Sequence, residues 1–323
     1  SVQLTIKSQG TDKISSMLLT MLQLYCFNAF VNTVIALILV ILGFIPLLLE
    51  FLMYKQFIDP LFIGHPSHNV IAKREAKGEA KKRFIVIGHS DSQYEWTLNY
   101  LLGGVGMKLV LIPAVVGLVA QCIASFIKFI CVDVKGMTGS GVDTFFLIVG
   151  IVLCIFVIPY IGFLFFQSYT KSVPGANDNL SGCYIGIAIL KALKDEGIEL
   201  ENTEIGVVLT GSEEAGLRGA KAWCEAHAHE FNDVPTFVYS YDTITQPEYM
   251  QANYRDLNAT VKVDKDVSDL YVEACEELGI KCGKGVVPPL GGATDSAAFA
   301  QAGMRSTGIT ALNHALPDFY HTR

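Results

Sequence analysis

Three long runs of the chain contain no charged residue and no histidine, and they limit what the rest can fold into. They cover residues 14–49, 109–127 and 144–170. Each run approaches or exceeds the roughly 20 residues that an α-helix needs to cross a lipid bilayer. The first is too long for a core helix of a globular protein, and it lacks the small-residue cleavage site of a signal peptide. We therefore expect a multi-pass membrane protein, with the lipid bilayer as a partner.

The composition narrows the class of partner further. Hydrophobic residues make up 51% of the chain and the mean hydropathy is +0.40, an excess that is concentrated in the three runs. The formal net charge of −7 disfavours nucleic acid as a partner. A basic cluster at residues 73–83 also contains glutamates, and it predicts a solvated β-hairpin around residues 77–79 rather than a contact with lipid head groups.

The eight cysteines show no C-x-x-C spacing of the kind that binds metals. Most of them are expected to be small buried hydrophobic residues, although Cys275 and Cys282 could form a disulfide. Their number favours a reducing compartment, which places the catalytic part on the cytoplasmic side of the membrane. The charges that flank the runs give no clear orientation of their own.

The runs divide the chain into membrane insertions and a remainder. Residues 100–166 are expected to form a helical hairpin, because a short glycine-rich segment at 128–143 joins the second and third runs. Residues 14–53 form the first insertion. We expect this insertion to contain two helices, one near 15–27 and one near 33–53, separated by a turn at Asn28 and Asn32. With the hairpin, this gives four membrane segments in all. The alternative is a single crossing preceded by an interfacial helix, which gives three segments.

The remaining pieces, residues 1–13, 54–99 and 167–323, are together large enough for one α/β domain. Short apolar runs are typical of strands buried on both faces, and they lie at residues 84–87, 205–209 and 237–239. Helices are predicted between and after them, at residues 181–197, 216–229 and 266–279, the last capped by Asp266 or Ser268. This alternation predicts a mixed, mostly parallel β-sheet sandwiched by helices, with transmembrane α-helices inserted.

Acidic and histidine side chains follow the predicted strands, at the sheet edge where sites of α/β proteins collect. His89, Glu213 and Asp242 end strands, and Asp91 is placed to orient His89 through its second ring nitrogen. Asp178 lies in a loop rich in glycine and asparagine, where a carboxylate bridging two metal ions would fit.

Two further side chains complete this set. Glu213 and Glu214 are adjacent carboxylates that repel unless cations neutralise them, so that one can bind metal while the other accepts a proton from water. His321 lies close to the last residue of the chain. Two histidines and three carboxylates suit a pair of zinc ions, which we expect as the cofactor, with Glu213 beside them as the base.

The segments that carry these residues resemble the zinc aminopeptidases of peptidase family M28, in order and in local sequence. They are residues 88–92, 174–179, 211–216, 241–242 and 320–322, and residues 291–296 resemble the late glycine-rich loop of that family. The resemblance implies that His89 and Asp242 bind one zinc, that Glu214 and His321 bind the other, and that Asp178 bridges them. It also implies that Glu213 is the general base, that Asp91 supports His89, that Tyr320 polarises the scissile carbonyl, and that a cis peptide bond follows Asp178.

The chain departs from the family in two respects. The 88 residues between His89 and Asp178 include the expected hairpin, which soluble members lack, and the family usually continues beyond the last histidine, so we expect further residues after Arg323. We expect a membrane-bound two-zinc exopeptidase, an aminopeptidase acting on peptides. The alternatives are a non-catalytic membrane scaffold of the same fold, a glutaminyl-cyclase-like acyltransferase with one zinc, and a carboxypeptidase or dipeptidase.

Overall fold

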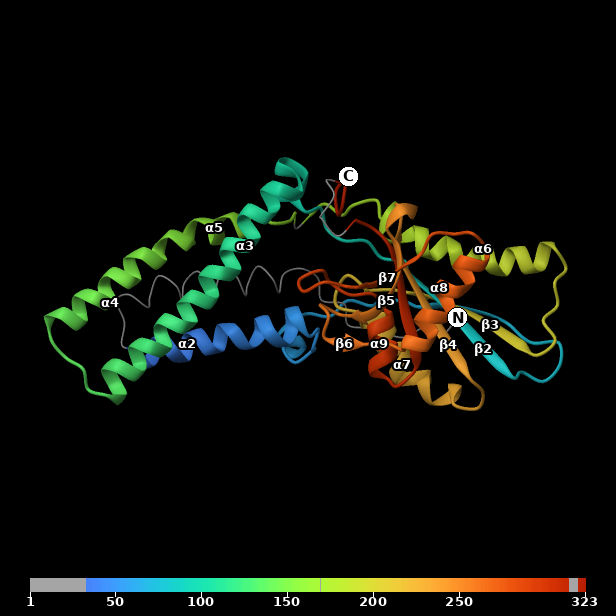
Figure 1. Ribbon diagram of the computed structural model, residues 1–323, viewed down its shortest axis with the longest axis horizontal. Helices are drawn as coiled ribbons and strands as arrows, with labels where there is room; N and C mark the ends of the chain where they lie inside the picture. The colour runs from blue at the N-terminus through green and yellow to red at the C-terminus, as the bar shows by residue number, and fades with distance from the viewer. Residues whose placement is uncertain (1–32, 169, 314–318) are drawn as a thin grey trace.

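The computed structural model describes residues 33–168, 170–313 and 319–323, and it has two parts (Figure 1). One is an α/β body built on a single twisted sheet. The other is a helical arm, residues 33–52 and 97–163, which extends from one end of the body. The sequence-based predictions for residues 1–13, for a helix near 15–27 and for a turn at Asn28 and Asn32 lie outside the described residues.

The sheet is mixed, with a parallel centre, as predicted. Its strand order is β1-β3-β2-β4-β8-β5-β6, and β7 pairs with β5. The pairs β3–β2, β2–β4, β4–β8 and β5–β7 are parallel, and the others are antiparallel. The strands are β1 (Val70–Arg74), β2 (Lys82–His89), β3 (Thr203–Thr210), β4 (Thr236–Ile244), β5 (Met250–Asp256), β6 (Val261–Lys262), β7 (Gly283–Val286) and β8 (Arg305–Ala311).

Helices cover both faces of the sheet. Helices α6 (Ser181–Asp195) and α8 (Lys265–Glu277) pack on one face, and α7 (Arg218–His227) and α9 (Ser296–Gln301) on the other (Figure 1). The α7 and α9 face buries Trp223 and Phe299 against Ile85 and Ile87 of β2. Side chains of this size each stabilise a fold by about 1.5–3 kcal/mol when fully buried. The three predicted strands and three predicted helices of the body all occur. Their bounds lie within two residues of the expected ones, except that β4 continues five residues past the predicted end at residue 239.

Two local predictions in the body are wrong. Residues 77–79 do not form a β-hairpin, because β3 lies between β1 and β2 in the sheet. The linker instead runs beside residues 200–202, where Lys77 N–H donates to Leu200 O at 2.9 Å and Gly78 N–H to Glu201 O at 2.8 Å. Helix α8 is capped by neither predicted residue: Asp264 accepts from the N–H groups of Asp266 and Val267. Cys275 and Cys282 are both free thiols.

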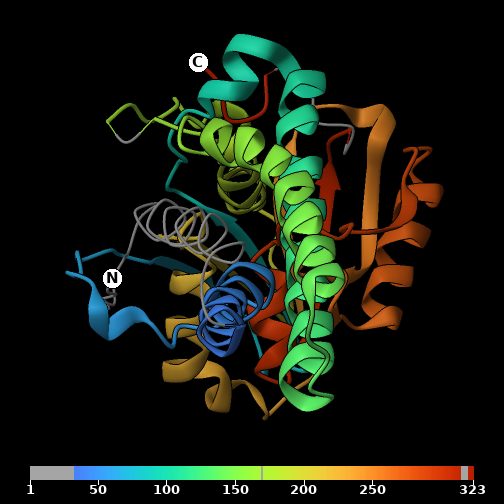
Figure 2. The ribbon, with the colours of Figure 1, turned by 90° about the vertical axis from the view of Figure 1, so that its left-hand side faces the viewer.

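The helical arm carries the apolar runs. Helix α2 (Thr33–Pro46) continues as η1 (Leu47–Leu52). Helix α3 (Thr97–Lys128) continues as η3 (Phe129–Val134), turns, and returns through α4 (Ser140–Leu153), η4 (Cys154–Phe156) and α5 (Val157–Phe163). Figure 2 looks along the arm from its tip toward the sheet. The predicted helix near 33–53 and the helical hairpin are therefore present as helices.

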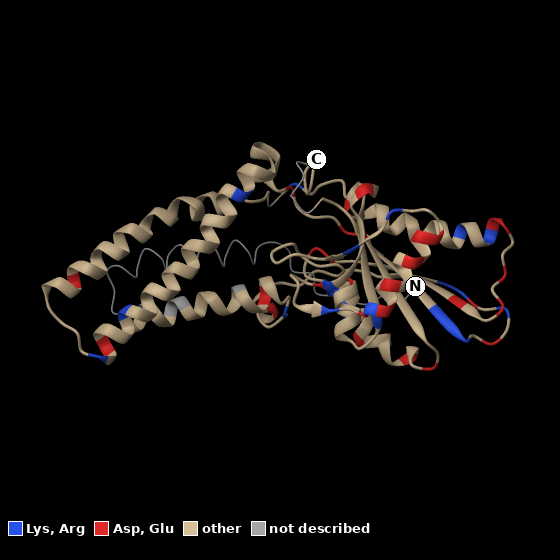
Figure 3. Ribbon diagram, in the orientation of Figure 1, with Lys and Arg blue, Asp and Glu red and all other residues tan. Residues whose placement is uncertain are grey.

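Two helices of the described residues are long and apolar enough to cross a membrane. They are Thr97–Val134 and Ser140–Phe163, and 28% and 6% of their most apolar windows are buried. The described charged residues of the arm gather near its ends, whereas the body carries them over its whole surface (Figure 3). The exposed side chains along the helices are large and apolar, among them Leu101, Val105, Leu109, Ile155 and Ile158.

Short segments connect the arm with the body. A strap, residues 50–62 including η2 (Asp59–Leu61), begins in the last turn of η1 and lies against the start of α7. Asp59 forms a bidentate ion pair with the buried guanidinium of Arg218, and Asn258 donates to Leu52 O at 3.0 Å. The strap therefore holds the first arm helix against the loop that precedes α7.

Candidate metal centre

The eight residues singled out by the sequence come from segments that meet at the carboxyl edge of the sheet. His89 ends β2, Asp242 lies near the end of β4, and Glu213 and Glu214 follow β3. Asp178 lies in η5 (Ala176–Leu180), just before α6, and His321 lies two residues before Arg323. Parallel strands bring their carboxyl ends to one edge, which is why residues far apart in the chain converge here.

The potential ligand atoms form two overlapping groups around one shared carboxylate. His89, Asp178 and Asp242 offer atoms that lie within 4.8 Å of one another, and so do Asp178, Glu214 and His321. His89 Nε2 lies 3.0 Å from Asp178 Oδ1, and His321 Nε2 lies 2.9 Å from Asp178 Oδ2. The two oxygens of Asp178 thus face the two histidines, as a bridging carboxylate requires.

A third group places Glu213 close to the same centre. Glu213 Oε2 lies 3.7 Å from His89 Nε2, and His89, Glu213 and Glu214 offer atoms within 4.8 Å of one another. Glu214 Oε1 lies 3.4 Å from His321 Nε2. The two adjacent glutamates therefore point at different histidines, in agreement with the expectation that their side chains diverge.

Buried polar atoms in the centre indicate a fit to metal ions. His89 Nε2 and Glu214 Oε1 are both buried, and neither makes a hydrogen bond of good geometry with the described residues. Buried polar atoms are normally satisfied, so such atoms in a native site call for a ligand. Imidazole nitrogens and carboxylate oxygens are ligands that zinc accepts. The residues present fit a pair of zinc ions.

The electrostatics of the protein residues alone lead to the same conclusion. Burial, together with the negative charge of the neighbouring Asp178, raises the pKa of Asp242 to about 8. Burial likewise raises the pKa values of Glu213 and Glu214. Although burial lowers the pKa of His321, Glu214 and Asp178 raise it to about 10. Without cations, these crowded buried carboxylates therefore retain protons. Metal ions bound at the same positions would take the place of the protons and balance the charge of the ionised carboxylates.

Asp91 lies beside His89 and has further partners that were not predicted. Its carboxylate accepts hydrogen bonds from the backbone N–H groups of Glu213 and Glu214, at 3.1 and 3.2 Å. The closer partner of His89 Nδ1 is the backbone carbonyl of Asp91, at 3.2 Å, whereas the carboxylate lies 3.5 Å away. Asp91 therefore fixes the tautomer of His89 through its main chain, and its side chain holds the glutamate loop.

The loop of Asp178 is held by its neighbour. The peptide bond between Asp178 and Asn179 is cis, as the resemblance implies. Asn179 Oδ1 accepts from Gly182 N at 3.0 Å, which caps α6, and Asn179 Nδ2 donates to Tyr241 O at 2.8 Å. A Cβ atom on Gly182 would lie 2.2 Å from Tyr241 O, so only glycine allows α6 to start this close to β4.

Tyr320 lies beside the centre, and the structure adds a second tyrosine that the sequence reasoning missed. Tyr320 stacks on His321, with ring centroids 4.0 Å apart. Tyr54 comes from the strap, and a Cβ atom on Gly216, next to the glutamate loop, would lie 3.7 Å from its ring. Burial raises the pKa of both phenols, and nearby carboxylates add to the effect. Nothing in the local sequence of Tyr54 marks it, because it follows an apolar run.

Two more residues near the centre were missed, Gln93 and Trp96. Gln93 Nε2 donates to Glu214 Oε2 at 3.1 Å, and the Trp96 ring meets His321 edge-on, with centroids 4.5 Å apart. Both belong to the segment that leads from His89 into α3. Two features of the sequence could have pointed to them. Gln93 lies in the polar run that follows His89, and Trp96 is one of only two tryptophans in the chain.

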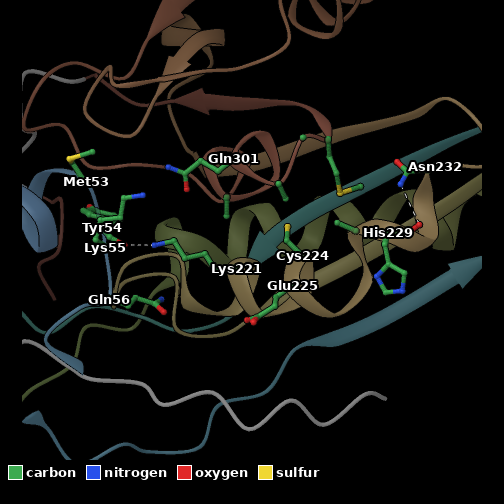
Figure 4. A pocket seen from close by; sticks show the side chains of 15 residues that line it. Met53, Tyr54, Lys55, Gln56, Lys221, Cys224, Glu225, His229, Asn232 and Gln301 are labelled. Atoms are coloured by element: carbon green, nitrogen blue, oxygen red, sulfur yellow. Dashed lines mark hydrogen bonds between the residues drawn. The ribbon is translucent and has the colours of Figure 1, made fainter. Parts of the chain in front are cut away.

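A hollow lies elsewhere, between the strap, α7 and α9 (Figure 4). It has a volume of about 650 Å³, and residues 53–56, Lys221, Glu225 and His229 contribute to its lining. Lys221 Nζ reaches across to the backbone carbonyl of Tyr54. None of the eight residues predicted for the site lines this hollow. The cluster of ligand atoms, rather than this hollow, therefore marks the candidate site.

Comparison with known proteins agrees with this geometry. A model of peptidase family M28 matches residues 164–323. This half of the chain belongs to peptidase family M28. The match includes Asp178, Glu213, Glu214, Asp242 and His321, and the structure places His89, from outside the matched range, beside them. No curated protein sequence matches the chain.

Solved structures of aminopeptidases are similar at low identity. They include a zinc aminopeptidase from Bacillus subtilis (TM-score 0.43, 16% identity, 77% of this chain and 41% of that one). A second is the TET aminopeptidase from the archaeon Thaumarchaeota, with a TM-score of 0.42 and 14% identity over 79% of this chain and 80% of that one. A third is LapA of Legionella pneumophila, with a TM-score of 0.40 and 16% identity over 49% of this chain and 42% of that one. The chain thus spans less than half the length of LapA and of the Bacillus enzyme. The family assignment rests on the M28 match.

Proposed function

We propose that this M28 metallopeptidase is a two-zinc aminopeptidase. His89 and Asp242 would hold one zinc, Glu214 and His321 the other, and Asp178 both. The observation that carries the proposal is the pair of ligand groups that share Asp178, with one histidine facing each of its oxygens. Two zinc ions bound here would lower the pKa of a water molecule and polarise a peptide carbonyl.

The side chains around the ligands supply the proton transfers. Glu213 Oε2, which lies 3.7 Å from His89 Nε2, is placed to accept a proton from water and to return it to the departing amine when the peptide C–N bond breaks. Asp91 holds the backbone of Glu213 and Glu214 and so keeps the two carboxylates apart in direction. The phenol of Tyr320 donates a hydrogen bond to the scissile carbonyl oxygen.

We also propose that the helical arm lies in a lipid bilayer. The support is the length and composition of its two longer helices, together with apolar side chains such as Leu101, Val105 and Leu109, which are 66%, 74% and 69% exposed. Contiguous exposed apolar surface of this kind marks a membrane or protein interface. Peptides released at a membrane surface are then the natural substrates, because the metal centre lies next to the base of the arm.

The deciding experiment combines zinc content with hydrolysis of a panel of aminoacyl fluorogenic substrates, for the wild-type protein and Glu213→Gln. We expect two zinc ions per chain in both proteins, and a loss of activity of roughly 10²–10⁴-fold in the variant. Glu196→Gln, an exposed acid at the end of α6, is the matched control and should behave as wild type.

The other outcomes identify the alternatives. Two zinc ions without turnover of any substrate that has a free amine would indicate a carboxypeptidase or dipeptidase. One zinc would favour the glutaminyl-cyclase-like chemistry. No bound metal would leave a scaffold of the M28 fold.

A further inference from the structure

The two chain segments at the base of the arm form a short antiparallel ladder beside the metal centre. We call residues 93–99 and 171–173 the arm root. Glu95 N–H donates to Lys171 O at 2.9 Å, Val173 N–H donates to Gln93 O at 2.9 Å, and Tyr94 forms a bridge with Ser172. The arm root therefore has a fixed backbone, and side chains on it are held at defined positions.

Gln93 uses this fixed position to reach a residue of the metal centre. Its Oε1 accepts from Tyr94 N at 2.9 Å, which orients the amide, and its Nε2 donates to Glu214 Oε2 at 3.1 Å. Glu214 Oε1 is left facing His321 without a hydrogen bond of good geometry to the described residues. One oxygen of the carboxylate is thus occupied by the amide of Gln93, and the other remains for a cation.

The arm root also contacts the second side chain of the same metal position. Trp96 packs edge-on against His321 with ring planes at 88°, and its backbone N–H donates to His321 O at 2.8 Å. Asn99 Nδ2 donates to Tyr320 O at 2.7 Å. Glu214 and His321 are therefore both supported by residues that lead into α3.

The other metal position has a different support. His89 Nδ1 faces the backbone carbonyl of Asp91, and Asp242 Oδ1 accepts from Thr243 Oγ1 at 2.8 Å. These contacts come from the ends of β2 and β4 and from residues next to them, not from the arm root. The two positions differ in this respect, although they share Asp178.

We propose that Gln93 is a positioning residue for Glu214, and that the arm root sets the metal affinity of the position formed by Glu214, His321 and Asp178. This inference rests on the proposed two-zinc function. Outer groups that orient metal ligands typically contribute 10–100-fold to metal affinity. The N–H donor of Gln93 is the decisive group, because it gives a hydrogen bond to an anionic carboxylate oxygen of Glu214.

The test is a zinc titration of the full chain in detergent, with a chelator as competitor. Gln93→Met keeps the length of the side chain but removes the donor, and we expect one of the two zinc affinities to fall 10–100-fold while the other is unchanged. Gln93→Glu places a second negative charge beside Glu214, and we expect it to lower the same zinc affinity further than Gln93→Met does. Gln167→Met is the matched control, because Gln167 is buried close to the arm root and its Nε2 has no hydrogen-bond partner among the described residues.

A second background assigns the effect to one position. His321→Ala leaves only the His89 and Asp242 position intact, and there Gln93→Met should change the remaining zinc affinity less than twofold. Equal affinities for wild type and Gln93→Met would overturn the inference, as would an equal loss in Gln167→Met. Absence of two zinc ions from the wild-type protein would instead refute the proposed function, before any variant is compared.

Discussion

At the scale of single residues, the carboxylate of Asp91 holds the loop that carries Glu213 and Glu214. His89, Glu213 and Asp242 could be placed together because each follows a strand, and parallel strands end at a common edge. The partner of Asp91 could not be predicted in the same way. Its carboxylate meets the N–H groups of Glu213 and Glu214, and the path of that loop depends on tertiary packing.

Asp91→Ala should therefore disturb Glu213 and Glu214 rather than His89 alone. Two hydrogen bonds to a carboxylate are lost, each worth about 1.5–3 kcal/mol. We expect peptide hydrolysis to fall by at least 10-fold and zinc affinity to weaken, while Asp91→Asn, which keeps an acceptor, loses less. Hydrolysis rates and zinc titration provide the measurement. Asp195→Ala, an exposed acid of α6, is the control, and activity of Asp91→Ala within twofold of wild type would contradict the role.

At the scale of elements, apolar runs predicted strands and helices well, because burial on both faces leaves a clear pattern. Features set by distant contacts were missed. The linker at residues 77–79 follows residues 200–202 of a neighbouring segment, which no local signal reveals. The cap of α8 was misplaced by two residues, since several acids precede the helix. Arg305 of β8 pairs with one of them, Asp264, and this contact is remote in sequence.

Asp264 gives a pH-dependent prediction. Partial burial raises its pKa, but the ion pair with Arg305 and the two helix N–H groups outweigh this, so that the pKa lies below the ordinary value of 3.8. A carboxylate with a lowered folded-state pKa stabilises the fold above the unfolded-state pKa, and this contribution is lost as the pH falls through the folded-state value.

Asp264→Asn keeps the cap but removes the charge. We expect the variant to melt at a lower temperature than wild type at pH 7. This difference in melting temperature, the gap, should close as the pH falls below about 3.8. Thermal unfolding of metal-free protein, followed by tryptophan fluorescence across this range, is the measurement. Asp266→Asn, whose side chain is 84% exposed and lies 3.6 Å from the same Arg305, should lower the melting temperature much less. A gap for Asp264→Asn that persists unchanged at the lowest pH would refute the account.

At the scale of the whole molecule, the chain combines a charged α/β body with an apolar arm. The hairpin of α3 to α5 begins and ends at the arm root, so His89 and Asp178 remain on the same side of it. Three uncharged runs predicted helices here. The sequence could not show that the arm root would support Glu214 and His321, because Gln93 and Trp96 belong to no repeating pattern.

If the arm lies in a bilayer, its tip and the body are on opposite sides. Lys135, between η3 and α4, and Lys281, between α8 and β7, are both exposed. In sealed vesicles of one orientation, a membrane-impermeant amine reagent should label one of these lysines and spare the other, whereas detergent should make both reactive. Mass spectrometry of the labelled peptides decides the outcome. Equal labelling of both lysines in sealed vesicles would exclude a spanning arm, and the identity of the labelled lysine gives the orientation.

The strap has a consequence for dissecting this protein. A fragment that starts at β1 would keep every proposed zinc ligand, and it would look like a natural way to obtain a soluble enzyme. It would, however, remove Asp59 from Arg218, a buried guanidinium that also donates to Ala215 O at 2.8 Å, next to Glu214. Removing one partner of a buried ion pair costs about 3–5 kcal/mol. A fragment of the α/β body should therefore start before Asp59, so that the strap is kept, rather than at β1.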